Sequence, residues 1–161
     1  MGQRQRLMTR VEIHEGPREA LRPLFEEAED SRPELDSYLE SGRVFVALAD
    51  GEIVGHLQLT ETDSPAEVEV KNIAVLAAHR RQGIGATLME AALALAREES
   101  RTLVRVATAA ADVDNLRFYQ RLGFRMRSIE PDAFVPATGY PAGTMIDGIE
   151  LRDRVWFDRA P

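Results

Sequence analysis

The alternation of hydrophobic and polar residues along the chain predicts several strands, and two of them are expected to form a hairpin. The segments RVFVALA and EIVGHLQL are rich in β-branched and other apolar residues, and only Asp50 and Gly51 separate them. Asp and Gly tolerate the positive φ angles that a two-residue hairpin turn requires. Further strands are predicted over residues 11–14, 68–75, 103–108, 124–129 and 151–157.

Helices are predicted where apolar residues recur about every three to four positions. A first helix is expected over residues 21–28. The S-x-x-E pattern of Ser31 and Glu34 is the capping box of a second, short helix. Two longer helices are expected over residues 83–100 and 115–122.

The resulting order of elements predicts a mixed α/β domain. A central mixed sheet of about six to seven strands with flanking helices is expected. The helix over residues 83–100 is a crossover connection, so the strands on either side of it should be parallel. No linker or repeat divides the sequence, and residues 1–161 are therefore expected to form one domain.

Composition excludes several classes of protein. The formal net charge of −7 disfavours a nucleic-acid binder, which neutralises phosphates with Lys and Arg. The absence of cysteine excludes disulfides, cysteine-ligated metals and thiolate intermediates, and the histidines lack metal-site spacing. No apolar run is long enough to span a bilayer or to form a signal peptide, so we expect a cytoplasmic protein with no membrane partner.

A glycine-rich turn stands between a predicted strand and a predicted amphipathic helix. The first N–H groups of a helix lack intrahelical partners, and glycine allows phosphate oxygens to approach the backbone, so the turn is a candidate anion site. Glycines before a helix are also simple conformational requirements, and this interpretation stays open. Leu88 replaces the third glycine of the dinucleotide fingerprint, and no Gly-Lys-Ser/Thr follows for a P-loop. The turn reads Arg80-Arg81-Gln82-Gly83-Ile84-Gly85-Ala86-Thr87.

Three segments taken together resemble a known family. They are V-x-V-K-N-I-A-V over residues 68–75, R-R-Q-G-I-G-A over residues 80–86 and D-N-L-R-F-Y-Q-R-L-G-F over residues 114–124. The sequence is similar to the GNAT superfamily of acyl-CoA-dependent N-acyltransferases, whose acetyl-CoA signature is Q/R-x-x-G-x-G/A. The resemblance implies a GNAT-like fold, with acetyl-CoA as the acyl-donor co-substrate and no metal.

The resemblance also implies how acetyl-CoA would be bound. The pyrophosphate would rest on backbone N–H groups of the glycine-rich turn, and the pantetheine arm would bind the main chain of a strand that splays from its parallel neighbour. Asn115 would hold the pantetheine from the next helix, one turn before Tyr119. The implied cofactor-binding residues are Ile73, Ala74, Val75, Arg80, Arg81, Gln82, Gly83, Ile84, Gly85, Ala86, Thr87, Asn115 and Tyr119.

Tyr119 and Glu69 are the catalytic residues that the resemblance implies. A phenol, with a pKa of about 10, can donate a proton to the thiolate that leaves when an amine attacks the thioester. Glu69 stands where many members of the family have a strand glutamate, and it would remove the proton of the amine directly or through water. Glu67 shares its strand face and remains an alternative. Tyr119 as a core aromatic and Glu69 as an exposed carboxylate also stay open.

The resemblance places the acceptor groove between the first two helices and the long, turn-rich stretch of residues 131–148. Acidic residues such as Glu29, together with Phe134 and Tyr140, would surround a small-molecule primary amine, for example a polyamine-like compound. Since no cysteine is present to carry an acyl group, direct transfer in a ternary complex is expected. A peptide or protein N-acetyltransferase and a non-catalytic acyl-CoA-binding regulatory module are the alternatives, and a homodimer stays open.

Overall fold

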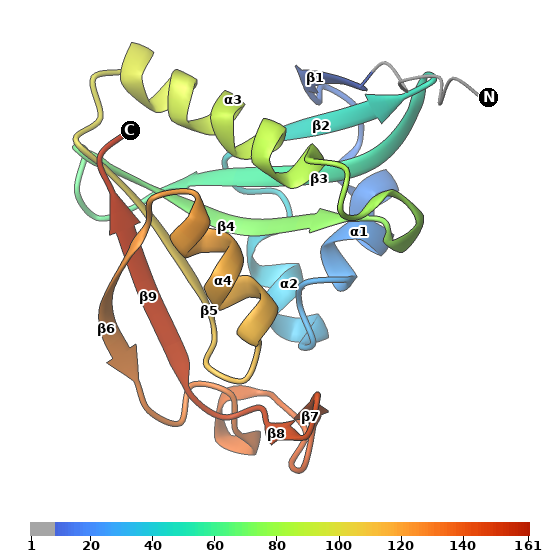
Figure 1. Cartoon of the computed structure of the whole chain (residues 1–161). Helices are drawn as coiled ribbons and strands as arrows, with labels where there is room; N and C mark the ends of the chain where they lie inside the picture. Colours follow the sequence, from blue (N-terminus) through green and yellow to red (C-terminus); the bar gives the residue numbers. More distant parts are fainter. Residues whose placement is uncertain (1–8) are drawn as a thin grey trace, which may run out of the picture.

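A seven-stranded sheet forms the centre of the computed structural model, which describes residues 9–161 (Figure 1). Residues 1–8 of the predicted domain lie outside this range. The strand order is β1-β2-β3-β4-β5-β9-β6. In it β4 and β5 are parallel and the other neighbours antiparallel, which confirms the predicted mixed sheet and crossover. The strands are β1 (Thr9–Ile13), β2 (Arg43–Ala49), β3 (Glu52–Glu61), β4 (Glu67–Val75), β5 (Leu103–Ala109), β6 (Arg125–Glu130) and β9 (Arg154–Arg159).

Helices cover both faces of the sheet (Figure 1). The main hydrophobic core lies between the sheet and α3, where Leu88 and Met89 are fully buried. A second, smaller core joins α1 and α2 to β2 through Phe25 and Leu35. The helices are α3 (Ile84–Glu98) and α4 (Val113–Arg121) on one face, and α1 (Arg22–Glu26) and α2 (Arg32–Tyr38) on the other. No helix among the described residues is long and apolar enough to cross a membrane.

Local sequence explains most element boundaries. In the β2–β3 hairpin, Asp50 and Gly51 have φ angles of 51° and 83°, which confirms the predicted turn. The predicted first helix is divided into a 3-10 turn and the short α1, because Pro23 fits only in the first turn of a helix. One of the two hydrogen bonds of the predicted capping box of α2 is present: Ser31 Oγ accepts from the N–H of Glu34. The other was predicted wrongly, since the N–H of Ser31 donates to Glu29.

The stretch between β6 and β9 is folded back on the domain. It holds a 3-10 turn (Pro136–Thr138) and the two-residue strands β7 (Met145–Ile146) and β8 (Ile149–Glu150). Tyr140 and Leu151 are buried against Ala109 of β5. The last strand was predicted to begin at residue 151 and begins instead at Arg154. The reason is that the N–H of Leu151 donates to Thr144 within this stretch rather than to β5.

Candidate functional site

The two central parallel strands separate part of the way along their length. They pair over residues 67–70 of β4 and 103–106 of β5, although both strands continue beyond the last pair. A bulge lies at the same level, since the register between β3 and β4 shifts between Gln58 and Leu59. Bulges bend the strand that carries the extra residue, which here leaves the facing edges of β4 and β5 unpaired with each other.

Main-chain groups of β4 face this unpaired edge. The N–H of Leu76 donates to the carbonyl of Val54 on β3 (2.9 Å). Because main-chain groups of successive residues point to opposite edges of a strand, those of Val75 and Ile73 point away from β3 and toward β5. The Val75 carbonyl accepts a hydrogen bond from Arg80. Ala74, also predicted to bind the cofactor, directs its main chain to β3.

The glycine-rich turn forms the start of α3, as the sequence predicts. Gly83 is the N-cap, and its carbonyl accepts the first helical hydrogen bond from the N–H of Thr87 (3.0 Å). The N–H groups of residues 84–86 therefore have no helical partner and carry the positive end of the helix dipole. Arg81 and Gly83 have positive φ angles of 62° and 79°. Where left-handed residues alternate with right-handed ones, successive backbone N–H groups point into one concave nest, a geometry that suits an anion. The Thr87 hydroxyl donates to Gly83 within the helix.

The two glycines of the turn are required for different reasons. A Cβ on Gly83 would meet nothing within 4 Å, so its positive φ is the constraint, and the space in front of it is open. A Cβ on Gly85 would lie 3.1 Å from the ring of Phe118 on α4. Gly85 therefore allows α4 to pack closely against the start of α3.

The two arginines of the turn are in different environments. The guanidinium of Arg80 donates to the Val75 carbonyl (2.9 Å) and to Glu27 on the other side of the sheet (3.3 Å). It therefore ties the turn to β4 and to the end of α1. Arg81 and Gln82 are exposed, and Arg81 forms no ion pair with any residue of 9–161. Arg81 is thus the arginine of the pair that is free to approach an anion.

Asn115 lies at the start of α4 beside the end of β5. Its side-chain amide donates to Thr108 Oγ1 (3.2 Å), and its N–H donates to Asp112, the N-cap of the helix (3.0 Å). Asp112 and Thr108 were not predicted. The run AADVDN contains two aspartates that could cap a helix, and spacing alone does not choose between them.

Tyr119 lies under α4 with its ring 3% exposed. The ring packs against Phe118, Phe124 and Phe157, at centroid distances of 5.3, 6.0 and 5.7 Å. Burial raises the pKa of Tyr119 far above that of a free phenol, and the charge of Asp112 raises it further. The hydroxyl is therefore protonated at neutral pH, and it donates to no residue within 9–161. The Tyr119 side chain therefore packs as a core aromatic and also carries a hydroxyl that donates to no described residue.

On the opposite face of the sheet, the predicted glutamates line a cavity of about 640 Å³. Val68 and Val70 are buried in the core with α3, so Glu67 and Glu69 point to the α1–α2 face. Glu69 lies 3.7 Å from the ammonium of Lys71, which in turn lies over the ring of Tyr38. Glu67 forms no ion pair with a described residue. The cavity is lined by Tyr38, Ser41, Gly42, Thr60, Glu61, Thr62, Asp63, Ser64, Glu67, Glu69, Lys71, Arg105 and Trp156.

The cavity and Tyr119 lie on opposite faces of the sheet, and the cavity reaches the first unpaired residue of β4. Trp156 lines the cavity, whereas its neighbour Phe157 packs against Tyr119. Adjacent strand residues point to opposite faces. Lys71, the first β4 residue beyond the last pair with β5, also lines the cavity.

A chain of buried hydrogen bonds, not predicted from the sequence, supports the cavity side. His56 Nε2 binds Asn72 Oδ1 (2.8 Å), and the Asn72 amide donates to the Tyr38 hydroxyl (3.0 Å). Tyr38 and Tyr140 donate to the two carboxylate oxygens of Glu29, at 3.1 and 2.8 Å. Glu29 was predicted to attract a cationic acceptor. It instead fastens the stretch before β9 to the chain between α1 and α2.

The protonation states in this chain follow from burial. His56 is 0% exposed, and burial lowers its pKa to about 4, so it is neutral at pH 7 and donates from Nε2. Burial also raises the pKa of Tyr38 and Tyr140, whose hydroxyls remain donors to Glu29. The sequence does contain a signal for these positions: His56 and Gln58 alternate as polar residues within an otherwise apolar strand.

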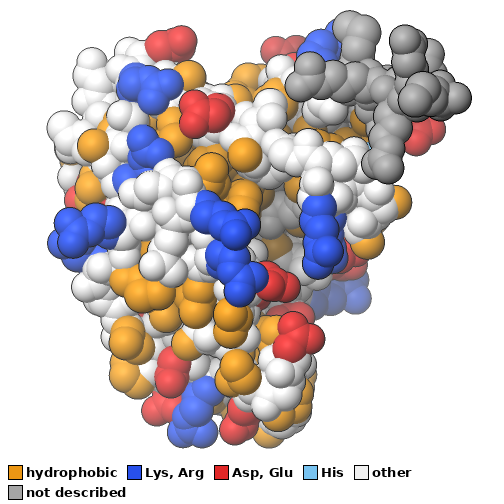
Figure 2. Space-filling model, in the orientation of Figure 1, with side chains coloured by type: hydrophobic (Ala, Val, Ile, Leu, Met, Phe, Trp, Pro, Cys, Tyr) orange, Lys and Arg blue, Asp and Glu red, His pale blue; other side chains and the backbone are white. Residues whose placement is uncertain are grey.

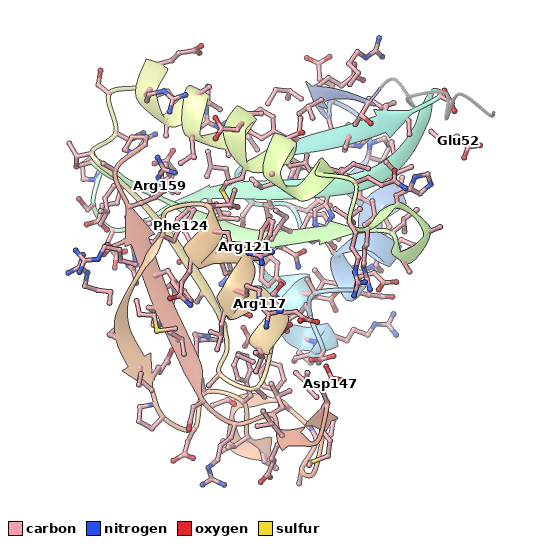
Figure 3. The ribbon with its side chains drawn as sticks, viewed as in Figure 1. Glu52, Arg117, Arg121, Phe124, Asp147 and Arg159 are labelled. Atoms are coloured by element: carbon pink, nitrogen blue, oxygen red, sulfur yellow. The ribbon has the colours of Figure 1, made fainter. Side chains whose placement is uncertain are left out.

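A second hollow, of about 530 Å³, lies on the outer side of α4 and includes Leu116 and Met126. Hydrophobic side chains gather over this part of the α3–α4 face (Figure 2). Arg117 and Arg121 project from α4 one turn apart (Figure 3). The hollow contains no carboxylate or imidazole that could accept a proton.

Comparison with known proteins connects these features to one family. Residues 10–124 match the family model described as the Acetyltransferase (GNAT) family. The chain is 32% identical over 146 residues to the uncharacterized N-acetyltransferase YvbK of Bacillus subtilis (strain 168), covering 91% of this chain and 92% of that protein.

Two solved structures are closely similar. One is a Bacillus subtilis acetyltransferase in complex with CoA, with a TM-score of 0.86, 30% identity, and coverage of 96% of this chain and 99% of that one. The other is an IAA acetyltransferase from Bacillus cereus ATCC 14579, with a TM-score of 0.86, 30% identity, and coverage of 96% and 100%.

Proposed function

This chain belongs to the GNAT acetyltransferase family, and we propose that it transfers an acetyl group from acetyl-CoA to the primary amine of a small molecule. One observation carries the proposal: β4 is unpaired with β5 beyond residue 70, and this part of it lies between an acid-lined cavity on one face and the turn whose free N–H groups begin α3 on the other. Both substrates would be held together, and the acetyl group would pass directly between them.

The residues around the turn fit acetyl-CoA. The free N–H groups of residues 84–86 suit a diphosphate, and Gly83 leaves open space in front of them. The main chain of Ile73 and Val75 offers an unpaired strand edge to the pantetheine amides. Asn115 adds a side-chain amide from α4. When bound, acetyl-CoA would supply the thioester carbonyl that the amine attacks. The similar Bacillus subtilis structure contains CoA.

Two side chains would move the protons of the reaction. The amine must lose a proton before it can form the new N–C bond, and Glu69 in the cavity would accept that proton directly or through water. As the C–S bond breaks, the Tyr119 hydroxyl would donate its proton to the departing sulfur. The raised pKa of Tyr119 keeps the phenol protonated at neutral pH, so its O–H is present when the thiolate forms.

The cavity supports a small acceptor. Its volume of about 640 Å³ lies within the range of small-molecule sites, roughly 300–1,000 Å³. The stretch of residues 131–148, predicted to border the acceptor, contributes no lining residue, and Phe134 and Tyr140 pack near Ala109 instead. A substrate-sized cavity fits a small molecule better than an extended peptide. The similar Bacillus cereus protein is named an IAA acetyltransferase, which also agrees with a small acceptor.

The proposal is tested with purified protein, acetyl-CoA and a panel of amino acids, amines and short peptides. We expect amine-dependent release of free thiol, with the acetylated product identified by mass. Glu69→Gln should lower kcat about 100-fold, whereas Glu67→Gln, on the same strand face, should stay within about twofold. Acetylation of peptides alone would favour the protein acetyltransferase, and acetyl-CoA binding without turnover would favour a regulatory module.

A further inference from the structure

The cavity is lined by an arginine, Arg105, that forms no ion pair within residues 9–161. Arg105 lies on β5, opposite Glu69 of β4 and opposite Asp158 of β9. Glu69 is nearest to Lys71, at 3.7 Å. Asp158 is held by two hydrogen bonds from Arg127, at 2.9 and 2.8 Å. Asp158 is therefore directed to another cation, and Glu69 lies within ion-pair distance of Lys71 but not of Arg105.

An aromatic ring holds the Arg105 side chain in place. Its guanidinium lies over the ring of Trp156, at 4.4 Å from the centroid. The indole N–H of Trp156 donates to Glu130 (3.2 Å), which fixes the orientation of the ring. Within residues 9–161, Arg105 forms no ion pair. A stacked guanidinium keeps its N–H groups free at its edge, and that edge matches the two oxygens of a carboxylate.

The same cavity offers acidic groups next to this arginine. Glu67 and Asp63 line it without an ion pair to a described residue, and the 3.7 Å contact of Glu69 is longer than a hydrogen bond. Glu69 and Arg105 are register partners on neighbouring strands, whose backbones lie about 4.8 Å apart. In an α-amino acid, a single carbon separates the amine from the carboxylate. The spacing therefore suits a molecule that carries both groups side by side.

We propose that the acceptor is a zwitterionic small molecule, an α-amino acid or a close analogue, whose carboxylate is bound by Arg105 and whose amine faces Glu69. The inference rests on the proposed acetyltransferase function and narrows its substrate class. A polyamine would leave Arg105 unpaired and add a second positive charge beside it. Arg105 therefore selects against simple amines, and Trp156 provides an apolar wall for the amino-acid side chain.

The test compares amino acids with the same molecules lacking the carboxylate: leucine with isoamylamine, phenylalanine with phenethylamine, and lysine with cadaverine. Wild-type protein should acetylate at least one amino acid with a kcat/KM about 100-fold or more above that of its decarboxylated partner. Arg105→Gln should lower the value for the amino acid about 10- to 100-fold and leave the partner amine within about twofold. Arg105→Lys keeps the charge and loses the planar fork of the guanidinium. Its kcat/KM for the amino acid should lie between those of the wild type and Arg105→Gln.

Arg97→Gln, at the far end of α3, is the matched control and should change neither value. The Kd for acetyl-CoA should be the same in all variants, which separates loss of the acceptor site from misfolding. Equal or better turnover of the decarboxylated amines, or an equal effect of Arg105→Gln on both members of a pair, would overturn the inference while leaving the acetyltransferase function intact.

If no amine at all is acetylated, the proposed function fails, and the zwitterion site is then tested by measuring amino-acid binding. Calorimetry with CoA-saturated protein should then show binding of an amino acid that Arg105→Gln abolishes, and no binding of its decarboxylated partner. Absence of amino-acid binding would reject the zwitterion site as well.

Discussion

The proposed donor side and the proposed acceptor side of this protein are built in different ways. The donor side, defined here as residues 73–87 with α4, consists of one strand, one turn and two helix starts, and it presents mainly backbone groups. The acceptor side, the 640 Å³ cavity and the hydrogen-bond chain beneath it, uses side chains from widely separated segments. A site made of backbone is determined locally, whereas a site made of side chains depends on how distant segments are packed.

The largest effect is expected for a substitution of Tyr119, the side chain that we propose to act from the donor side. Tyr119→Phe should lower kcat about 100- to 1,000-fold, because it removes the proton donor for the leaving sulfur. Its aromatic contacts remain, and its hydroxyl has no described partner to leave unsatisfied. The melting temperature and the Kd for acetyl-CoA should therefore be unchanged. Wild-type turnover in this variant would return Tyr119 to a packing role.

The acceptor side should respond to acid through His56. Burial lowers its pKa from 6.5 to about 4, so the unfolded chain binds this proton more readily than the folded one. The stabilising contribution is complete above pH 6.5 and is lost as the pH falls toward 4, and it is worth about 3 kcal/mol at most.

Denaturant titrations between pH 4 and 7 measure this loss. His56→Gln should flatten the dependence of stability on pH, whereas His14→Gln, at a partly exposed position, should leave it as in the wild type. An equally steep dependence in both variants would show that carboxylates cause the acid sensitivity.

Gly83 and Gly51 provide a matched pair for the donor side. Both have positive φ angles, 79° and 83°, and a Cβ on either would meet nothing within 4 Å. An alanine at either position should cost about 1–2 kcal/mol of strain. Gly83→Ala should in addition weaken acetyl-CoA binding about tenfold, because relief of the strain moves the N–H groups of the turn. Gly51→Ala should bind acetyl-CoA normally, and an equal loss of affinity in both would contradict the pyrophosphate assignment.

The smallest effect is expected at Tyr140, which we place wholly on the acceptor side. Tyr140→Phe removes its hydrogen bond to Glu29 and should cost about 1 kcal/mol of stability. Looser fastening of the stretch before β9 should raise the KM for the amine a few-fold while the KM for acetyl-CoA stays constant. A parallel rise in both KM values would mean that the stretch also supports the donor side.

The same contrast explains how far the sequence could be interpreted. The hairpin turn, the crossover and the start of α3 were predicted correctly because local residues, such as Asp50 with Gly51, restrict the backbone directly. The bond from Tyr140 to Glu29 joins residues 111 positions apart, and no local pattern indicates it. Glu29 was predicted to attract a cationic amine and instead accepts hydrogen bonds from Tyr38 and Tyr140. The position of Arg105 between Glu69 and Asp158 likewise depends on the pairing of β4, β5 and β9, which no local pattern indicates.

The placement of Tyr119 and the cavity on opposite faces of the sheet has a kinetic consequence. If the proposed sites are right, each substrate would enter from its own face of the sheet, and neither would have to pass the place that the other occupies. We therefore expect no compulsory order of addition: initial-rate plots against either substrate should intersect, and each product should act as a competitive inhibitor of the substrate that shares its site. Free CoA can leave while the acetylated acceptor is still bound, and the acetylated acceptor can leave while CoA is still bound.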